Sequence, residues 1–186
     1  MLNPMMRFAV AACLVILPGC GRAEPPLVLA DLDGGPVPVL PVPRTSVFIF
    51  IAPDCPISNR YAPEIARLRD RFSATTAFRV VYPGARVTAE RARTHRAEYL
   101  KGTPAVLDPD LRLARATGAR TTPEAVVLTP DRGMVYRGRI DDLFVDYGVQ
   151  RPEPSTRDLQ AAIDAVLSGS AVPITRAPAV GCRISD

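Results

Sequence analysis

The chain has 186 residues, 47% hydrophobic and 23% charged, a composition close to the globular average that excludes a disordered or fibrous protein. This length fits one domain with appendages. The formal net charge of +4, from 23 basic and 19 acidic residues, is too small and too evenly spread to indicate nucleic-acid binding. The single histidine excludes a zinc site built from several histidines.

The N-terminus has the layout of an export signal. A short segment with one arginine precedes an apolar run, Phe8–Leu17, that is shorter than the ~18–20 residues of a membrane-spanning helix. Residues 1–19 are therefore predicted to be a lipoprotein-type signal peptide. The segment 17–20 (LPGC) resembles a bacterial lipobox, so we expect lipidation of Cys20 and an exported, lipid-anchored protein of the periplasm or cell envelope. The alternative is ordinary cleavage after Ala23.

Both cleavage sites leave the same two cysteines in the soluble part of the chain. Cys13 lies in the signal, and Cys20 is either lipidated or removed. Cys55 and Cys182 remain, in a compartment that allows disulfides to persist.

The mature chain begins with a proline-rich segment. Residues 20–44 are predicted to form a linker and an N-terminal β-hairpin, because the many prolines exclude helix and central strand. Residues 45–169 follow as one domain, and residues 170–186 as an irregular tail that carries Cys182.

Strands and helices alternate in the predicted domain. The apolar run at 46–52 is typical of a strand buried on both faces. Further strands are predicted at 78–82, 105–107, 125–128 and 134–140. Helices are predicted at 56–72, 88–101, 111–117 and 155–167. Within them we expect a kink at Pro63, a helix end at Gly118 and an N-cap at Ser155. Three helical connections followed by a hairpin indicate a mixed α/β sheet with helices on both faces.

Cys55 directly follows the buried strand and precedes a helix. Pro56 suits the first helical position, so the thiol is expected at the helix N-terminus, where backbone N–H groups favour the thiolate. The hydroxyl of Ser58 is placed to donate a hydrogen bond to the same sulfur. The alternative is a buried cysteine that only fills space.

Four segments together resemble exported redoxins of the alkyl hydroperoxide reductase/thiol-specific antioxidant (AhpC/TSA) group. They are 55–65 (CPISNRYAPEI), 122–125 (TPEA), 136–142 (YRGRIDD) and 180–182 (VGC). The resemblance implies a thioredoxin-like fold and no cofactor. It also implies a cis Thr122–Pro123 bond facing Cys55, with Pro56, Thr122 and Pro123 contacting substrate.

The chain departs from this pattern in two places. A thioredoxin has a second cysteine where Ser58 stands, and a typical peroxiredoxin has a threonine where Ala52 stands. Cys55 therefore lacks a local partner. Cys182 is the candidate, and three alternatives stay open: a redox-active pair, a structural disulfide, or no pairing.

His95 lies in a polar helix and is expected on its solvated face. The functional alternative is a Cu(I)-binding module, similar to Sco-type copper chaperones, with Cys55 and Cys182 as ligands, either alone or together with His95. The charged residues of segment 137–142 are expected to form surface ion pairs of little energetic value.

The leading hypothesis is a thiol oxidoreductase without a metal. Cys55 is the nucleophile that attacks a protein disulfide or a peroxide, Ser58 stabilises its thiolate, and Cys182 resolves the adduct. The electron donor is unidentified. A non-catalytic adaptor with a structural disulfide is the remaining alternative.

Overall fold

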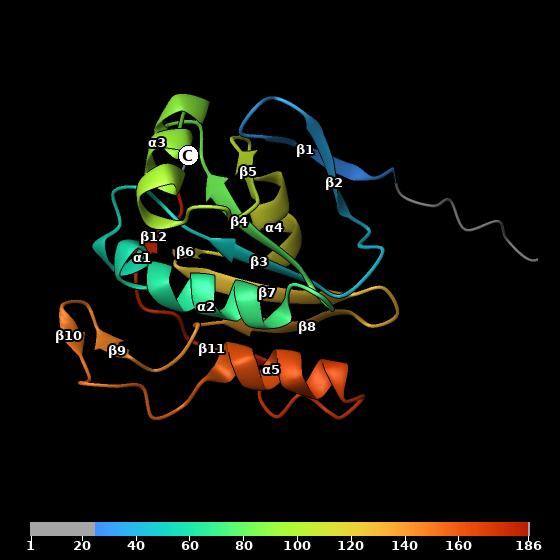
Figure 1. Cartoon of the computed structure of the whole chain (residues 1–186), viewed down its shortest axis with the longest axis vertical. Helices are drawn as coiled ribbons and strands as arrows, with labels where there is room; N and C mark the ends of the chain where they lie inside the picture. The colour runs from blue at the N-terminus through green and yellow to red at the C-terminus, as the bar shows by residue number, and fades with distance from the viewer. Residues whose placement is uncertain (1–24, 186) are drawn as a thin grey trace, which may run out of the picture.

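The computed structural model describes residues 25–185, in which five helices surround an eight-stranded sheet of order β11-β8-β7-β3-β4-β5-β1-β2 (Figure 1). The sheet strands are β1 (Leu27–Asp31), β2 (Pro36–Leu40), β3 (Ser46–Phe50), β4 (Ala77–Pro83), β5 (Ala105–Asp108), β7 (Glu124–Thr129), β8 (Gly133–Gly138) and β11 (Arg176–Ala177). Two small sheets pair β9 (Phe144–Asp146) with β10 (Val149–Gln150) and β6 (Thr121–Thr122) with β12 (Cys182–Arg183). The helices are α1 (Pro56–Arg60), α2 (Ala62–Phe72), α3 (Ala89–Tyr99), α4 (Arg112–Thr117) and α5 (Asp158–Leu167).

The central strand β3 divides the hydrophobic core into two layers. Its alternate side chains Val47 and Ile49 face the layer that contains α2 and α5, which lie side by side in Figure 1. Phe48 and Phe50 face the other layer, which contains α4 and the hairpin of β1 and β2. All five residues of β3 are buried, and each large apolar side chain contributes about 1.5–3 kcal/mol by leaving water.

The predicted mixed α/β fold is confirmed. Strands β3, β4 and β5 are parallel neighbours, and β7 and β8 form the predicted antiparallel hairpin. The predicted helix 56–72 is divided at Tyr61, and Pro63 lies in the first turn of α2, where its missing N–H costs no helical hydrogen bond. Gly118 ends α4 in the left-handed conformation, with φ 70°.

The N-cap prediction for Ser155 is wrong. Helix α5 begins at Asp158 with Arg157 as its N-cap residue. The Ser155 side chain instead donates a hydrogen bond to the carboxylate of Asp142.

The tail after α5 is irregular over most of its length, but two short strands attach it to the domain. β11 runs parallel to β8, where a Cβ on Gly138 would lie 2.2 Å from the carbonyl oxygen of Ala177, so only glycine permits this approach. β12 is antiparallel to β6. Within residues 25–185, no helix combines the length and apolarity that crossing a membrane requires. The predicted signal peptide and the predicted lipidation site Cys20 lie outside the described residues.

Candidate active site

Cys55 lies just beyond β3, at the N-terminus of α1. Its backbone N–H donates to the carbonyl of Ala52, and its carbonyl accepts from the N–H of Asn59, both at 3.1 Å. Pro56 occupies the first turn of α1, as predicted. The Cys55 side chain is 0% exposed. The buried strand and the helix start thus fix the sulfur inside the protein.

The strand β6 and the proline after it form the opposite wall of the site. The Thr122–Pro123 peptide bond is cis, which confirms the prediction. In its thiol form, Cys55 Sγ donates a hydrogen bond of 3.0 Å to the carbonyl oxygen of Thr122. The cis-proline loop therefore contacts the sulfur directly.

The C-terminal tail brings the second cysteine to the same place. In the β12–β6 pair, Cys182 lies opposite Thr122, and the Thr122 hydroxyl donates to the Cys182 carbonyl at 3.3 Å. The N–H of Ile184 donates to the carbonyl of Arg120 at 2.9 Å. A Cβ on Gly181 would lie only 2.1 Å from the Thr122 carbonyl oxygen, so glycine allows the tail to lie against the loop.

Cys55 and Cys182 are both free thiols, and each lies near enough to shift the pKa of the other. Burial raises the pKa of the Cys55 thiol. Hydrogen bonds from the side chains of Cys182 and Ser58 and from their backbones lower it by more, so the pKa lies below the ordinary value of a thiol. The Ser58 oxygen accepts from the N–H of Ala52 at 3.4 Å, which leaves its proton for the sulfur. Ser58 lies in α1 and is buried.

Cys182 has the opposite shift. Burial and its hydrogen bond to Cys55 raise the pKa of the Cys182 thiol, while a hydrogen bond with Tyr147 lowers it by less. The Tyr147 hydroxyl lies 3.8 Å from Cys182 Sγ. Cys55 at the helix is therefore the more acidic of the two thiols, and Cys182 on the tail is the less acidic one.

The prediction that His95 is solvated is wrong. His95 is 5% exposed, and its ring nitrogens lie 2.8 Å from the Tyr82 hydroxyl and 2.8 Å from the Asn59 side-chain oxygen. The Asn59 amide also donates to the carbonyl of Pro53. His95 thus ties α3 to α1 and to the loop before Cys55.

Residues 25–185 contain no three-ligand site of the kind that the copper alternative would use. No group of three or more His, Cys, Asp and Glu side chains is placed there to hold a metal ion. His95 is bonded to Tyr82 and Asn59 and does not join the two cysteines in such a group.

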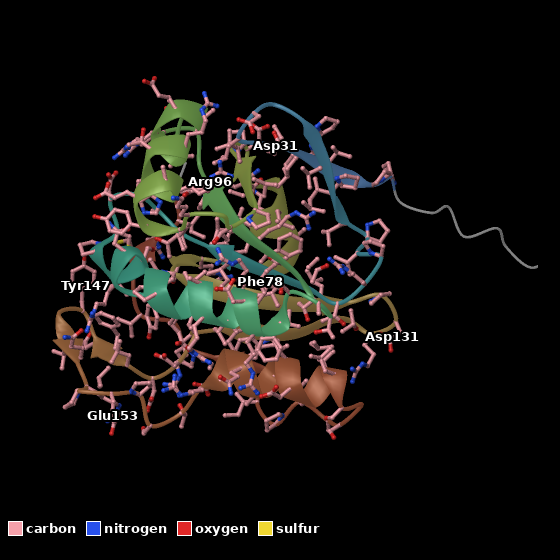
Figure 2. All side chains as sticks on the ribbon, in the orientation of Figure 1. Asp31, Phe78, Arg96, Asp131, Tyr147 and Glu153 are labelled. Atoms are coloured by element: carbon pink, nitrogen blue, oxygen red, sulfur yellow. The ribbon has the colours of Figure 1, made fainter. Side chains whose placement is uncertain are left out.

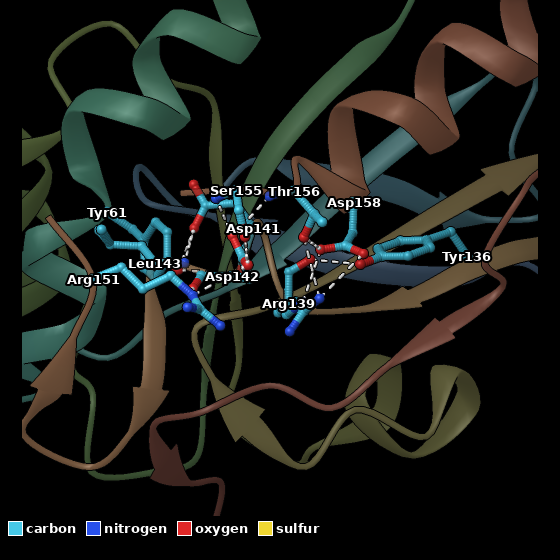
Figure 3. A network of polar contacts seen from close by, with 10 residues as sticks. All are labelled: Tyr61, Tyr136, Arg139, Asp141, Asp142, Leu143, Arg151, Ser155, Thr156 and Asp158. Carbon is cyan, nitrogen blue, oxygen red and sulfur yellow. Dashed lines mark hydrogen bonds and ion pairs between the residues drawn. The ribbon is translucent and has the colours of Figure 1, made fainter. Parts of the chain in front are cut away.

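Ion pairs form in segment 137–142 as expected: Arg137 pairs with Glu124, Arg139 with Asp158, and Asp142 with Arg151. Their expected surface location is wrong for the acidic residues, because Asp141 and Asp142 are only 3% and 5% exposed. Figure 3 shows both carboxylates within a polar network that joins this segment to the start of α5. Asp141 accepts a 2.6 Å hydrogen bond from the Tyr61 hydroxyl. Asp142 accepts from the N–H groups of Ser155 and Thr156 at 2.7 and 2.8 Å.

A cavity of about 310 Å³ is lined by Pro56, the chain neighbour of Cys55, and by Tyr147, whose hydroxyl lies near Cys182. It is mostly apolar and is lined by Pro56, Ile57, Arg60, Phe144, Tyr147, Gly148 and Gln150. The hairpin of β9 and β10 supplies the second half of this lining, and sequence reasoning missed it. Segment 144–150 shows no extended alternation of apolar and polar residues, and Tyr147 carries no signal that sets it apart from other surface tyrosines.

No family model and no curated protein matches the chain. Several solved structures do. An uncharacterized conserved protein from Geobacillus kaustophilus aligns with TM-score 0.74 and 27% identity over 89% of this chain and 91% of its own. The hypothetical protein SMc02350 from Sinorhizobium meliloti 1021 gives TM-score 0.72 and 27% identity over 86% and 90%.

A secreted Mycobacterium tuberculosis disulfide oxidoreductase, homologous to E. coli DsbE, aligns with TM-score 0.54 and 15% identity over 77% of this chain and 95% of its own. This likeness shows the fold. The chain is a thioredoxin-like α/β protein, with a cysteine at the head of α1 and a cis-proline loop opposite it.

Proposed function

We propose that this protein is a thiol oxidoreductase in which Cys55 is the nucleophile and Cys182 the resolving thiol. The observation that carries the proposal is the β12–β6 pair, which sets Cys182 opposite Thr122, the residue whose carbonyl oxygen accepts the hydrogen bond from Cys55 Sγ. The lowered pKa of Cys55 supports the assignment of the nucleophile. The resemblance to exported AhpC/TSA redoxins supports the same reaction class.

The chemistry proceeds in two exchanges. The Cys55 thiolate attacks one sulfur of a substrate disulfide, forms a mixed disulfide and releases the other half as a thiolate. Cys182 then attacks Cys55 Sγ, forms the Cys55–Cys182 disulfide and releases the second thiolate. With a peroxide, the first step gives a sulfenic acid on Cys55 and an alcohol or water, and the second step releases water. An external thiol reductant returns the pair to its reduced form.

Substitution of the resolving thiol tests the proposal. Cys182→Ser should trap a mixed disulfide between Cys55 and the substrate, because a serine cannot resolve it. Cys55→Ser should form no adduct. Mass spectrometry after exposure to a small disulfide or to hydrogen peroxide separates the two substrate classes. If Cys182→Ser turns over as fast as the parent, or if neither thiol reacts, the pair is not catalytic.

We also propose export and lipid attachment at Cys20, which rest on the apolar run and the LPGC segment. The intact mass of the mature protein tests this: a diacylated N-terminal Cys20 supports it, and an unmodified start at Glu24 contradicts it. Substrates in this setting are disulfide-bearing proteins or peroxides of the cell envelope.

A further inference from the structure

The resolving step needs a thiolate on Cys182, and its surroundings oppose one. Burial, the neighbouring Cys55 and the carboxylate of Asp54 all favour the protonated form of Cys182. Tyr147 acts in the opposite direction. A resolving thiol in this position therefore needs a donor that stabilises its negative charge.

We propose that Tyr147 is a catalytic residue of the resolving step, whose phenolic O–H donates to Cys182 Sγ and stabilises the attacking thiolate. The proposal rests on the proposed function of the cysteine pair. The hydroxyl lies 3.8 Å from the sulfur. A thiolate has no proton to give, so the phenol must be the donor once Cys182 is ionised. The same hydrogen bond raises the pKa of Tyr147, which therefore keeps its proton.

Packing does not account for this tyrosine. Its side chain is 63% exposed, at the turn between β9 and β10 and next to α1 in Figure 2. Its backbone N–H is bonded to the side chain of Asp146 at 2.7 Å, which fixes the turn. An exposed aromatic ring held at the site by its turn is consistent with a role at the sulfur rather than in the core.

The hairpin that carries Tyr147 is itself anchored to the domain. Phe144 packs against Tyr61 with ring centroids 5.6 Å apart, and the Tyr61 hydroxyl is bonded to the buried Asp141. The N–H of Leu143 donates to the same carboxylate at 2.9 Å, and the N–H of Arg151 donates to the Leu143 carbonyl at 2.7 Å. The polar network drawn in Figure 3 thus anchors the hairpin through Leu143 and Arg151 at its two ends.

The Cys182 thiolate attacks Cys55 Sγ in the mixed disulfide, and the bond between Cys55 and the substrate sulfur breaks. The electron pair leaves with the substrate thiolate, which takes a proton from water. Cys182 is oxidised, the substrate sulfur is reduced, and the Tyr147 proton stays on its oxygen.

Ellman's disulfide provides the test, because it separates the two steps. The first equivalent of thionitrobenzoate reports attack by Cys55, and the second reports resolution by Cys182. Tyr147→Phe should leave the rate of the first release unchanged and slow the second release about threefold at neutral pH. The variant has less Cys182 in the thiolate form, which slows resolution. Part of this loss is offset because the more basic Cys182 thiolate is a better nucleophile. At alkaline pH, where Cys182 is ionised in both proteins, the second release should be at least as fast in the variant as in the parent.

The pH profile distinguishes this role from a merely displaced hairpin, which would slow the second release at every pH. Val145→Ala is the matched control, since Val145 is 53% exposed on the same hairpin; it should change neither release. An unchanged second release in Tyr147→Phe, or a slowing independent of pH, overturns the proposal for Tyr147 alone. Absence of a second release in the parent overturns the proposed cysteine pair, and the role of Tyr147 with it.

Discussion

Replacing Gly181 by alanine tests whether the tail closes the site over Cys55. The new Cβ would lie 2.1 Å from the Thr122 carbonyl oxygen and 2.8 Å from its carbonyl carbon, both backbone atoms that cannot rotate away. Ordinary contact needs at least 3.4 Å. The tail must therefore move outward by more than an ångström, and the pairing of Cys182 with Thr122 is lost.

The size of the effect follows from the contacts that hold β12. They include the hydrogen bond from Thr122 Oγ1 to the Cys182 carbonyl and the one from the Ile184 N–H to the Arg120 carbonyl. At about 0.5–1.5 kcal/mol each, their loss weakens the closed state by about 1–3 kcal/mol. The population with Cys55 uncovered should then rise about fivefold to about 160-fold.

Alkylation of Cys55 by iodoacetamide measures that population, because the sulfur is 0% exposed when the tail is docked. The reduced protein is alkylated at a pH above the ordinary thiol range, so that the Cys55 thiol is fully ionised in both the parent and the variant. Mass spectrometry of the peptides then distinguishes Cys55 from Cys182. Gly169→Ala is the control: this glycine also resists substitution, with φ 73°, but no atom lies within 4 Å of its added Cβ. Equal alkylation rates for Gly181→Ala and the parent would refute the closed-site model.

Three further outcomes are expected. The Cys182 side chain lowers the pKa of Cys55, so the pH midpoint of Cys55 alkylation should rise in Cys182→Ala. An unchanged midpoint would show that Cys182 does not stabilise the Cys55 thiolate. Burial raises the pKa of Asp142, but hydrogen bonds lower this pKa to about 2. The ionised Asp142 carboxylate therefore stabilises the fold above about pH 4, and this contribution is lost as the pH falls toward 2. Urea unfolding of Asp142→Asn should lack this acid-dependent loss. Tyr61→Phe leaves the buried Asp141 carboxylate with the Leu143 N–H but without its side-chain donor, and should cost about 1–3 kcal/mol in the same assay; no loss would show that the Tyr61–Asp141 bond is dispensable.

Local patterns in the sequence were enough to predict the centre of the fold. The apolar run of β3 and the Cys-Pro start of α1 are determined by neighbouring residues, so the position of Cys55 followed directly. The cis bond before Pro123 followed from the resemblance to redoxins rather than from the residues themselves.

The contacts that the sequence did not reveal are those between distant segments. Thr122 and Cys182 are 60 residues apart, and their pairing depends on a close approach that only the absent Cβ of Gly181 permits. His95 was expected in water because its helix is rich in charge, yet its ring is buried against Tyr82. A polar helix can still bury one polar side chain when both of its hydrogen-bonding atoms find partners.

The reduction potential of the Cys55–Cys182 couple tests the central claim most directly. The protein is equilibrated in thiol–disulfide buffers of graded potential, and the reduced fraction is measured by alkylation and intact mass. Hydrogen bonds from Cys182 and Ser58 stabilise the reduced form of Cys55, which raises the potential of the couple. We predict a value above about −300 mV, in the range of exchangeable disulfides. A value below about −300 mV would define a structural bond and contradict the two-thiol cycle.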